Sequence, residues 1–189
     1  MLKEKKLDLL VIALKDEFEH PNKPDNLEVI YTGVGKVNAT FALTKAIYEH
    51  KPNRVFNFGT AGAVSENLHG LITVSGFIER DMDARGQGFK LGQTPFEEDI
   101  LIGEEGIICG TGDSFVTSIP SITCDLVDME GYALAKVCKY LNIEFYSYKF
   151  ISDKADSTAS KDWEKSVNDG QSLFLNKLNE SDSGSRNWF

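Results

Sequence analysis

Basic residues and long apolar runs are both scarce in this sequence. The chain has 20 Lys and Arg residues against 29 Asp and Glu residues, so its formal net charge is −9 at pH 7. Nucleic acids and acidic membrane surfaces repel a chain of this charge. No apolar run reaches the roughly 20 residues that span a bilayer, and the N-terminal segment lacks the cleavage site of a signal peptide. We therefore expect neither nucleic acid nor a membrane as a partner.

Cysteine and histidine are also rare, with three of each. The cysteines lie far apart and form no CxxC pair, which is typical of reduced, buried thiols in a cytoplasmic protein. The histidines are not at a spacing that suits a metal ion. We therefore expect a cytoplasmic protein that holds neither a metal nor another cofactor.

Short apolar runs alternate with helical patterns along the chain. The expected strands are residues 7–14, 27–35, 54–64, 71–84, 105–115 and 143–153, and the expected helices are 36–52, 129–141 and 160–179. This alternation predicts parallel pairing with right-handed crossovers. We expect one α/β domain over residues 1–180, a three-layer sandwich with a central mixed, mostly parallel sheet flanked by helices. A polar tail over residues 181–189 follows it.

The helix over residues 36–52 has apolar residues at helical spacing, and Pro52 lies just past its end. The spacing predicts that its buried side carries Val37, Phe41, Leu43 with Thr44, and Ile47 with Tyr48.

Four glycine-rich or polar segments each end an expected strand: "GVGK", "GTAGA", "GTGDSF" and "ISDKAD". In α/β folds ligands bind beyond the carboxyl ends of the strands, so these segments predict one shared pocket. "GVGKVNA" is not a nucleotide-binding loop, because Asn38 and Ile30 stand where the dinucleotide and P-loop patterns need glycine. The helix that follows it can still attract an anion at its N-terminus. Turn geometry alone also explains these glycines.

Glu130 stands at the start of the apolar stripe of the helix over residues 129–141. One interpretation is local, with Asp125 or Asp128 as the N-cap and Glu130 as a first-turn acid near the positive end of the helix dipole. The other interpretation is that Glu130 points into the pocket and binds hydroxyl groups. The helix pattern leaves both open.

Asp153 follows an apolar strand in the region where pocket groups collect. Desolvation there would raise the pKa of its carboxyl group, so that it holds a proton near neutral pH and donates it. An N-cap or an Asx turn is the alternative, because Ser152, Asp153 and Asp156 all suit turns.

Five segments together resemble the purine nucleoside phosphorylase superfamily, and most of all its hydrolytic branch, the 5'-methylthioadenosine/S-adenosylhomocysteine nucleosidases. They are "YTGVGKVNAT", "NFGTAGAV", "GTGDSF", "VDMEGYALAKVC" and "KFISDKAD", and they occur in the family's order over most of residues 9–157. The "ME" and "SD" pairs are the specific part of the resemblance. It implies a purine nucleoside as substrate and hydrolysis of its N-glycosidic bond.

The resemblance implies how the substrate is bound. Glu130 would hydrogen-bond the ribose hydroxyls and Met129 would pack on the sugar. Phe115 would stack on the purine, and the backbone of Val116 would read the edge of the base.

The resemblance also implies the catalytic roles. Asp153 would protonate or hydrogen-bond N7 of the purine, and Ser152 would support its loop. Glu17 would activate the attacking water. Thr60 and Gly62 would line the ribose and water side of the pocket.

Two other functions stay open at this stage. A phosphorolytic enzyme needs cations for phosphate, whereas "NFGTAGA" holds no arginine, the N-terminal segment has an acidic pair, and Arg54 lies too early in its strand. A catalytically inactive nucleoside-binding protein is the other alternative, because the chain is shorter than the family in two places, after Pro24 and after "QTPFEED".

The resemblance further implies a homodimer, in which the loop over residues 82–96 reaches the neighbouring subunit. Arg85 and Gln87 of that loop would make the surroundings of the nucleoside's 5'-substituent more polar.

Overall fold

The computed structural model describes residues 7–19, 23–97, 102–103, 106–157, 159–166 and 168–181, so all but the first residue of the expected tail lies outside it. The strands are β1 (Asp8–Ile12), β2 (Leu27–Tyr31), β3 (Arg54–Ala63), β4 (Leu71–Val74), β5 (Gly76–Glu79), β6 (Ile102–Gly103), β7 (Ile108–Thr111), β8 (Leu126–Asp128) and β9 (Glu144–Asp153). The helices are η1 (Lys15–Glu17), α1 (Lys36–His50), η2 (Arg85–Gln87), α2 (Gly131–Tyr140), α3 (Ala159–Ser166) and α4 (Gln171–Ser181).

The strands form one nine-stranded sheet with the path β2-β1-β3-β8-β7-β5-β6, to which β9 adds beside β3 and β4 beside β9. Most pairings are parallel, including those of β1 with β2 and β3 and that of β3 with β9. The antiparallel pairings are β3 with β8, β4 with β9, and β5 with β6. The expected mixed, mostly parallel sheet is confirmed.

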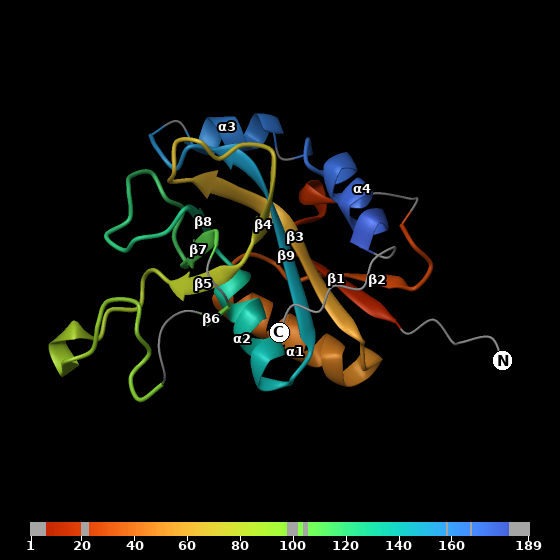
Figure 1. Ribbon diagram of the computed structural model, residues 1–189, viewed down its shortest axis with the longest axis horizontal. Helices are drawn as coiled ribbons and strands as arrows, with labels where there is room; N and C mark the ends of the chain where they lie inside the picture. The colour runs from red at the N-terminus through yellow and green to blue at the C-terminus, as the bar shows by residue number, and fades with distance from the viewer. Residues whose placement is uncertain are drawn as a thin grey trace.

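Helices cover both faces of this sheet (Figure 1). Alternate residues of β1 face opposite layers, as the period of two of a strand requires. Leu9 and Val11 join the cluster under α1 and α2, while Leu10 and Ile12 join the cluster that packs against α4. The second cluster is largely aromatic, and Phe174 of α4 stacks on Phe58 of β3. The result is the expected three-layer sandwich.

The prediction for the buried side of α1 was partly wrong. Leu43 and Ile47 are buried, but Val37, Phe41 and Tyr48 are 79%, 71% and 69% exposed. The helix buries Ala39 and Ala46 instead, whose small side chains let it lie close to the sheet and α2. The large apolar side chains therefore form a second, outward stripe.

The expected single helix over residues 160–179 was also wrong, because the segment folds as α3 and α4 with Gly170 between them. A Cβ atom at Gly170 would stand 2.6 Å from Phe150 of β9. The helix is interrupted at Gly170, where the backbone lies directly against Phe150 of the sheet.

The pairing of β3 is interrupted at one place. Because β9 occupies one edge of β3 from Arg54 to Gly62, β1 and β8 share the other edge. The pairing with β1 ends at Asn57, and that with β8 begins at Gly62. Between them, within the described chain, this edge of β3 has no strand partner. Such an opening in a sheet is where α/β folds bind ligands.

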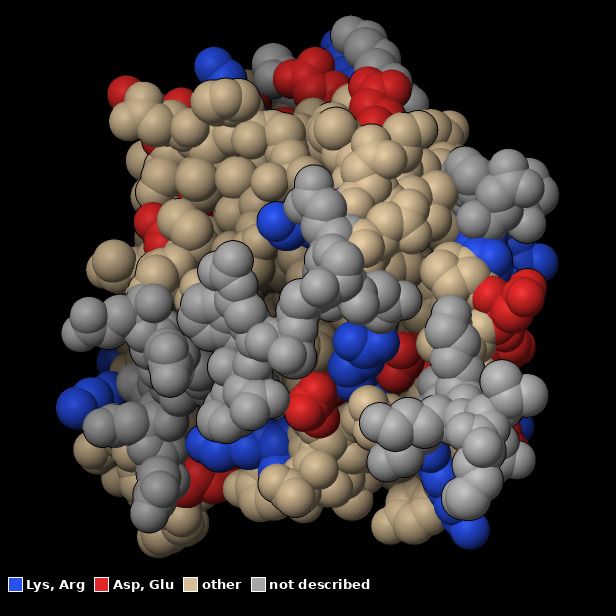
Figure 2. Space-filling view, turned by 45° about the vertical axis from the view of Figure 1, so that its right-hand side comes forward, with Lys and Arg blue, Asp and Glu red and all other residues tan. Residues whose placement is uncertain are grey.

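Acidic and basic side chains lie next to one another on the face shown in Figure 2. None of the helices described here combines the length and the apolar character needed to cross a bilayer. Among the described residues there is also no group of three or more His, Cys, Asp or Glu side chains that could hold a metal ion.

Candidate active site

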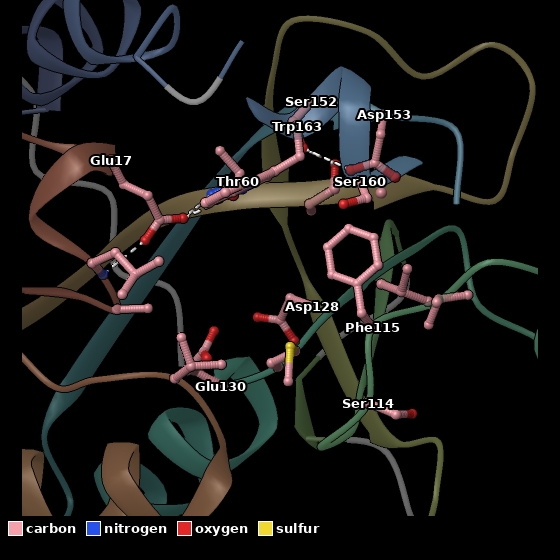
Figure 3. Close-up of a pocket in the computed structure, with 18 of the residues that line it drawn as sticks. Glu17, Thr60, Ser114, Phe115, Asp128, Glu130, Ser152, Asp153, Ser160 and Trp163 are labelled. Atoms are coloured by element: carbon pink, nitrogen blue, oxygen red, sulfur yellow. Dashed lines mark hydrogen bonds between the residues drawn. The ribbon is translucent and has the colours of Figure 1, made fainter. Parts of the chain in front are cut away.

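A pocket of about 280 Å³ opens at the interrupted edge of β3 (Figure 3). Its volume is near the lower end of small-molecule sites, roughly 300–1,000 Å³. The residues expected from the sequence all line it: Glu17, Thr60, Gly62, Phe115, Val116, Met129, Glu130, Ser152 and Asp153. They come from the ends of four strands, β3, β7, β8 and β9, and from η1, so the strand ends converge as expected. Their individual roles stay predictions.

Glu17 accepts three hydrogen bonds, two of them from β3. Its Oε1 accepts from the backbone N–H and the hydroxyl of Thr60, both at 2.8 Å. Its Oε2 accepts from the N–H of Leu14 at 3.1 Å. The N–H of Thr60 is free to do this because β3 lacks a strand partner at that point. Glu17 is thus buried and held by backbone groups far apart in the sequence.

Two glycines of "GTAGA" make room for carboxylates. A Cβ atom at Gly59 would lie 3.2 Å from Oε1 of Glu17, and one at Gly62 would lie 2.6 Å from Oδ1 of Asp153. The backbone of β3 can approach both acids only because these positions have no side chain. Both glycines lie within β3 rather than after it.

Glu130 receives a hydrogen bond from the first turn of α1. The N–H of Gly35 donates to its Oε1 at 2.8 Å, so this carboxylate is an anion held at the N-terminus of that helix. The pKa of Glu130 is raised to about 7: burial is the largest cause, and the neighbouring Asp128 and Glu17 also raise it, against the lowering effect of Lys149 and Gly35. Gly35 has φ +97°, a conformation that suits glycine.

Asp128 and Lys149 form a buried ion pair that the sequence analysis did not identify. The Nζ of Lys149 lies 2.8 Å from Oδ2 of Asp128, and both side chains are almost fully buried. Burial alone would raise the pKa of Asp128, but the charge and hydrogen bond of Lys149 lower it, and the same pairing raises the pKa of Lys149. Both groups are therefore charged at neutral pH.

The N-cap of α2 is Glu130, so the interpretation that placed Asp125 or Asp128 at the N-cap and Glu130 in the first turn was wrong. Asp128 still binds the start of the helix. Its Oδ2 accepts a hydrogen bond from the N–H of Gly131, the first residue of α2. Its Oδ1 accepts from the hydroxyl of Thr111 at 2.6 Å. Asp128 therefore stabilises the helix start without being its N-cap, and Glu130 lines the pocket.

Asp153 likewise combines a turn with a position in the pocket. Its Oδ1 accepts from the N–H of Ala155, which is an Asx turn, and its Oδ2 accepts from the hydroxyl of Ser152, both at 2.8 Å. Burial is the largest influence on the carboxyl group and raises its pKa against the lowering effect of these two hydrogen bonds. A β-bulge between Ala61 and Gly62 brings this end of β9 over the pocket.

Arg80 holds the loop that carries Phe115 and Val116. Its guanidinium donates to the carbonyl of Gly112 at 3.0 Å, to the hydroxyl of Ser114 at 3.2 Å and to the carbonyl of Ser114. Phe115 is 48% exposed and stands at the pocket between Asp153 and Ser114 (Figure 3). An aromatic face in this position can stack on a planar ring.

Helix α3 contributes two further lining residues, Ser160 and Trp163, that the sequence analysis did not find. The indole N–H of Trp163 donates to the hydroxyl of Thr60 at 2.8 Å. The two residues are 103 positions apart, so no local pattern signals the contact.

Comparison with known proteins agrees with this geometry. A family model described as the phosphorylase superfamily matches residues 25–105 and 104–180. The chain is 28% identical to the 5'-methylthioadenosine/S-adenosylhomocysteine nucleosidase of Staphylococcus haemolyticus, covering 87% of this chain and 86% of the relative. It is 30% identical to the Haemophilus ducreyi nucleosidase of the same name, covering 74% and 72%.

Among solved structures, a mutant of the Helicobacter pylori nucleosidase with 5'-methylthioadenosine in its active site superposes with a TM-score of 0.82. The two sequences are 20% identical, and the match covers 94% of this chain and 99% of that one. At this identity the superposition shows the shared fold. From the family match and the relatives, this chain belongs to the phosphorylase superfamily.

Proposed function

We propose that this protein hydrolyses the N-glycosidic bond of a purine nucleoside of the 5'-methylthioadenosine/S-adenosylhomocysteine type, releasing adenine and the ribose moiety. One observation carries the proposal: three buried acids, Glu17, Glu130 and Asp153, converge on a single pocket. Glu17 and Asp153 approach β3 at Gly59 and Gly62, three residues apart, which is about 10 Å at roughly 3.3 Å per residue. This spacing leaves room for a sugar and a water molecule between them.

The mechanism follows from how the bond breaks. An N-glycosidic bond cleaves through a ribosyl cation-like state, so catalysis requires a proton for the departing base and a base for the water. Asp153 donates the proton to N7, and burial raises the pKa of its carboxyl group, which favours the protonated form. Glu17 accepts a proton from the water. Glu130 binds the ribose hydroxyls while Met129 packs on the sugar.

The charges around the pocket favour water over phosphate as the nucleophile. Arg80 is the one Lys or Arg among the described lining residues, and its guanidinium is committed to the loop at Gly112 and Ser114. Arg54 pairs with Asp8 at the opposite end of β3. Phosphate would meet the carboxyl groups of Glu17 and Glu130, and like charges repel.

Adenine release in the absence of phosphate is the first expected outcome. Purified protein is incubated with 5'-methylthioadenosine, S-adenosylhomocysteine, adenosine or inosine, with and without phosphate, and the free base is measured by chromatography. Release that depends on phosphate would identify a phosphorylase instead. No release, with adenine still binding, would identify an inactive nucleoside-binding protein.

Asp153→Asn should lower kcat by at least about 100-fold, because general acid catalysis contributes 10²–10⁴-fold and the amide has no acidic proton. The change is nearly isosteric, so the melting temperature should stay close to that of the wild type. The matched control is Asp169→Asn, at an exposed aspartate outside the pocket, which should keep full activity. An Asp153→Asn protein as active as the wild type would remove Asp153 from the mechanism.

The pH dependence of kcat/KM should report Glu130. Only its ionised form accepts hydrogen bonds from both ribose hydroxyls, and its pKa is about 7. The value of kcat/KM should therefore rise with pH through about 7. Glu130→Gln should abolish this rise and weaken kcat/KM by roughly 10- to 100-fold, the worth of one charge-assisted hydrogen bond. An unchanged rise in Glu130→Gln would assign it to another group.

We also propose that the protein is a homodimer and acts in the cytoplasm. The outward stripe of α1, defined as Val37, Phe41 and Tyr48, is highly exposed and continues toward Val34 at the pocket. Phe96, in the loop over residues 82–96, is 93% exposed. Exposed apolar groups of this extent mark interaction surfaces, and a second copy of the chain would cover them.

The cytoplasmic location is supported by the three buried, unpaired cysteines.

Phe41→Lys should weaken the dimer, because it places a charge in the centre of the outward stripe. We expect the wild type to sediment as a dimer at micromolar concentration and Phe41→Lys to dissociate at least about tenfold more readily, the effect of about 1.4 kcal/mol. Leu173→Lys is the matched control, since Leu173 is a 46% exposed apolar residue on α4. A monomeric wild type would contradict the dimer proposal.

A further inference from the structure

Trp163 and Thr60 form a short hydrogen-bonded chain that ends on Glu17. The indole nitrogen of Trp163 lies 2.8 Å from Oγ1 of Thr60, and Oγ1 lies 2.8 Å from Oε1 of Glu17. These two hydrogen bonds connect α3, β3 and η1 across the pocket (Figure 3).

The direction of these hydrogen bonds follows from the chemistry of the groups. An indole N–H donates only, and a hydroxyl has a single hydrogen. Thr60 must therefore accept from Trp163, which leaves its own hydrogen for Glu17. Without the indole N–H, the hydrogen bond to Glu17 alone would set the orientation of the Thr60 hydroxyl.

This arrangement restricts which atom of Glu17 can act on water. A carboxylate has about four acceptor sites. Oε1 accepts from the backbone and the hydroxyl of Thr60, while Oε2 accepts from Leu14. Of the contacts described, three sites are used, and the remaining one lies on Oε2.

Helix α3 also contacts the loop of the other catalytic acid. The hydroxyl oxygen of Ser166, at the end of α3, lies 3.0 Å from the carbonyl oxygen of Ser152 and 2.9 Å from that of Asp162, and the two share its single hydrogen. One short helix therefore connects the loop of Asp153 with the hydrogen bonds of Glu17.

We propose that Trp163 is a positioning residue, which orients the hydroxyl of Thr60 so that Glu17 presents Oε2 to the attacking water. The inference rests on the proposed function, since it assumes that Glu17 is the base. The role belongs to the indole N–H, because an aromatic ring without an N–H cannot donate a hydrogen bond to Thr60.

Trp163→Phe separates these two roles, because it keeps the ring and removes the N–H. It should lower kcat about 3- to 10-fold, within the range of one neutral hydrogen bond, and change KM by less than about twofold. Thr60→Val should lower kcat further, since it also removes the donor to Glu17. Thr60→Ser keeps the hydroxyl and should restore nearly full activity.

The decisive measurement is the double variant. In a Thr60→Val background, Trp163→Phe should not lower kcat further, because the indole N–H then has no hydroxyl to orient. In a Thr60→Ser background, Trp163→Phe should lower kcat as much as it does in the wild type. Lys161→Ala, at an exposed residue of α3, controls for general disturbance of the helix and should leave kcat unchanged.

Fluorescence tests the contact without turnover. The sequence has two tryptophans, so Trp188→Phe leaves Trp163 as the single emitter, and the activity of that variant becomes the reference. Thr60→Val should then move the emission maximum and Thr60→Ser should not.

The outcomes separate the two proposals. A wild type that releases no base overturns the proposed function and this inference with it. Loss of activity in Glu17→Gln, with Trp163→Phe as active as the wild type, overturns the inference alone. The inference alone is also overturned if Trp163→Phe lowers kcat by the same factor in the Thr60→Val background as in the wild type.

Discussion

The buried ammonium group of Lys149 makes the carboxylates around the pocket tolerable to the fold. Asp128, Glu130 and Glu17 are all buried, and burying unpaired charges is costly. Lys149 keeps Asp128 ionised and limits the rise in the pKa of Glu130. Breaking such a pair leaves an isolated buried charge, which costs about 3–5 kcal/mol in other proteins. Glu130, which the proposed chemistry requires for ribose binding, therefore depends on a buried cation.

The location of the site depends on how β3 is paired. Its free edge between Asn57 and Gly62 supplies a backbone N–H to Glu17, and its glycines let Glu17 and Asp153 approach. A continuous ladder would use that N–H within the sheet, and any larger residue would displace the acids. The same few residues of β3 thus set both the opening in the sheet and the separation of the two acids.

Sequence patterns identified the sheet and its layers, because those patterns lie in strands and at strand ends. The nine lining residues came from the resemblance to the purine nucleoside phosphorylase superfamily. The face of α1 was not predictable, since Val37, Phe41 and Tyr48 follow helical spacing as well as Ala39, Leu43 and Ala46 do. Two apolar stripes on one helix indicate two contacts, and periodicity does not say which is internal. Lys149 was missed because it stands in an apolar strand, and Trp163 because its partner is distant in sequence.

The local and the functional interpretations of an acidic residue are not alternatives in this fold. Asp153 closes an Asx turn with Ala155, and the same hydrogen bond partly offsets the desolvation that raises its pKa. Asp128 binds the first N–H of α2 while it neutralises Lys149. The turn and the helix start fix each carboxyl group to backbone atoms, so that its orientation does not depend on a ligand. A site organised before the substrate arrives avoids the cost of ordering it during the reaction, and the turn chemistry provides that order.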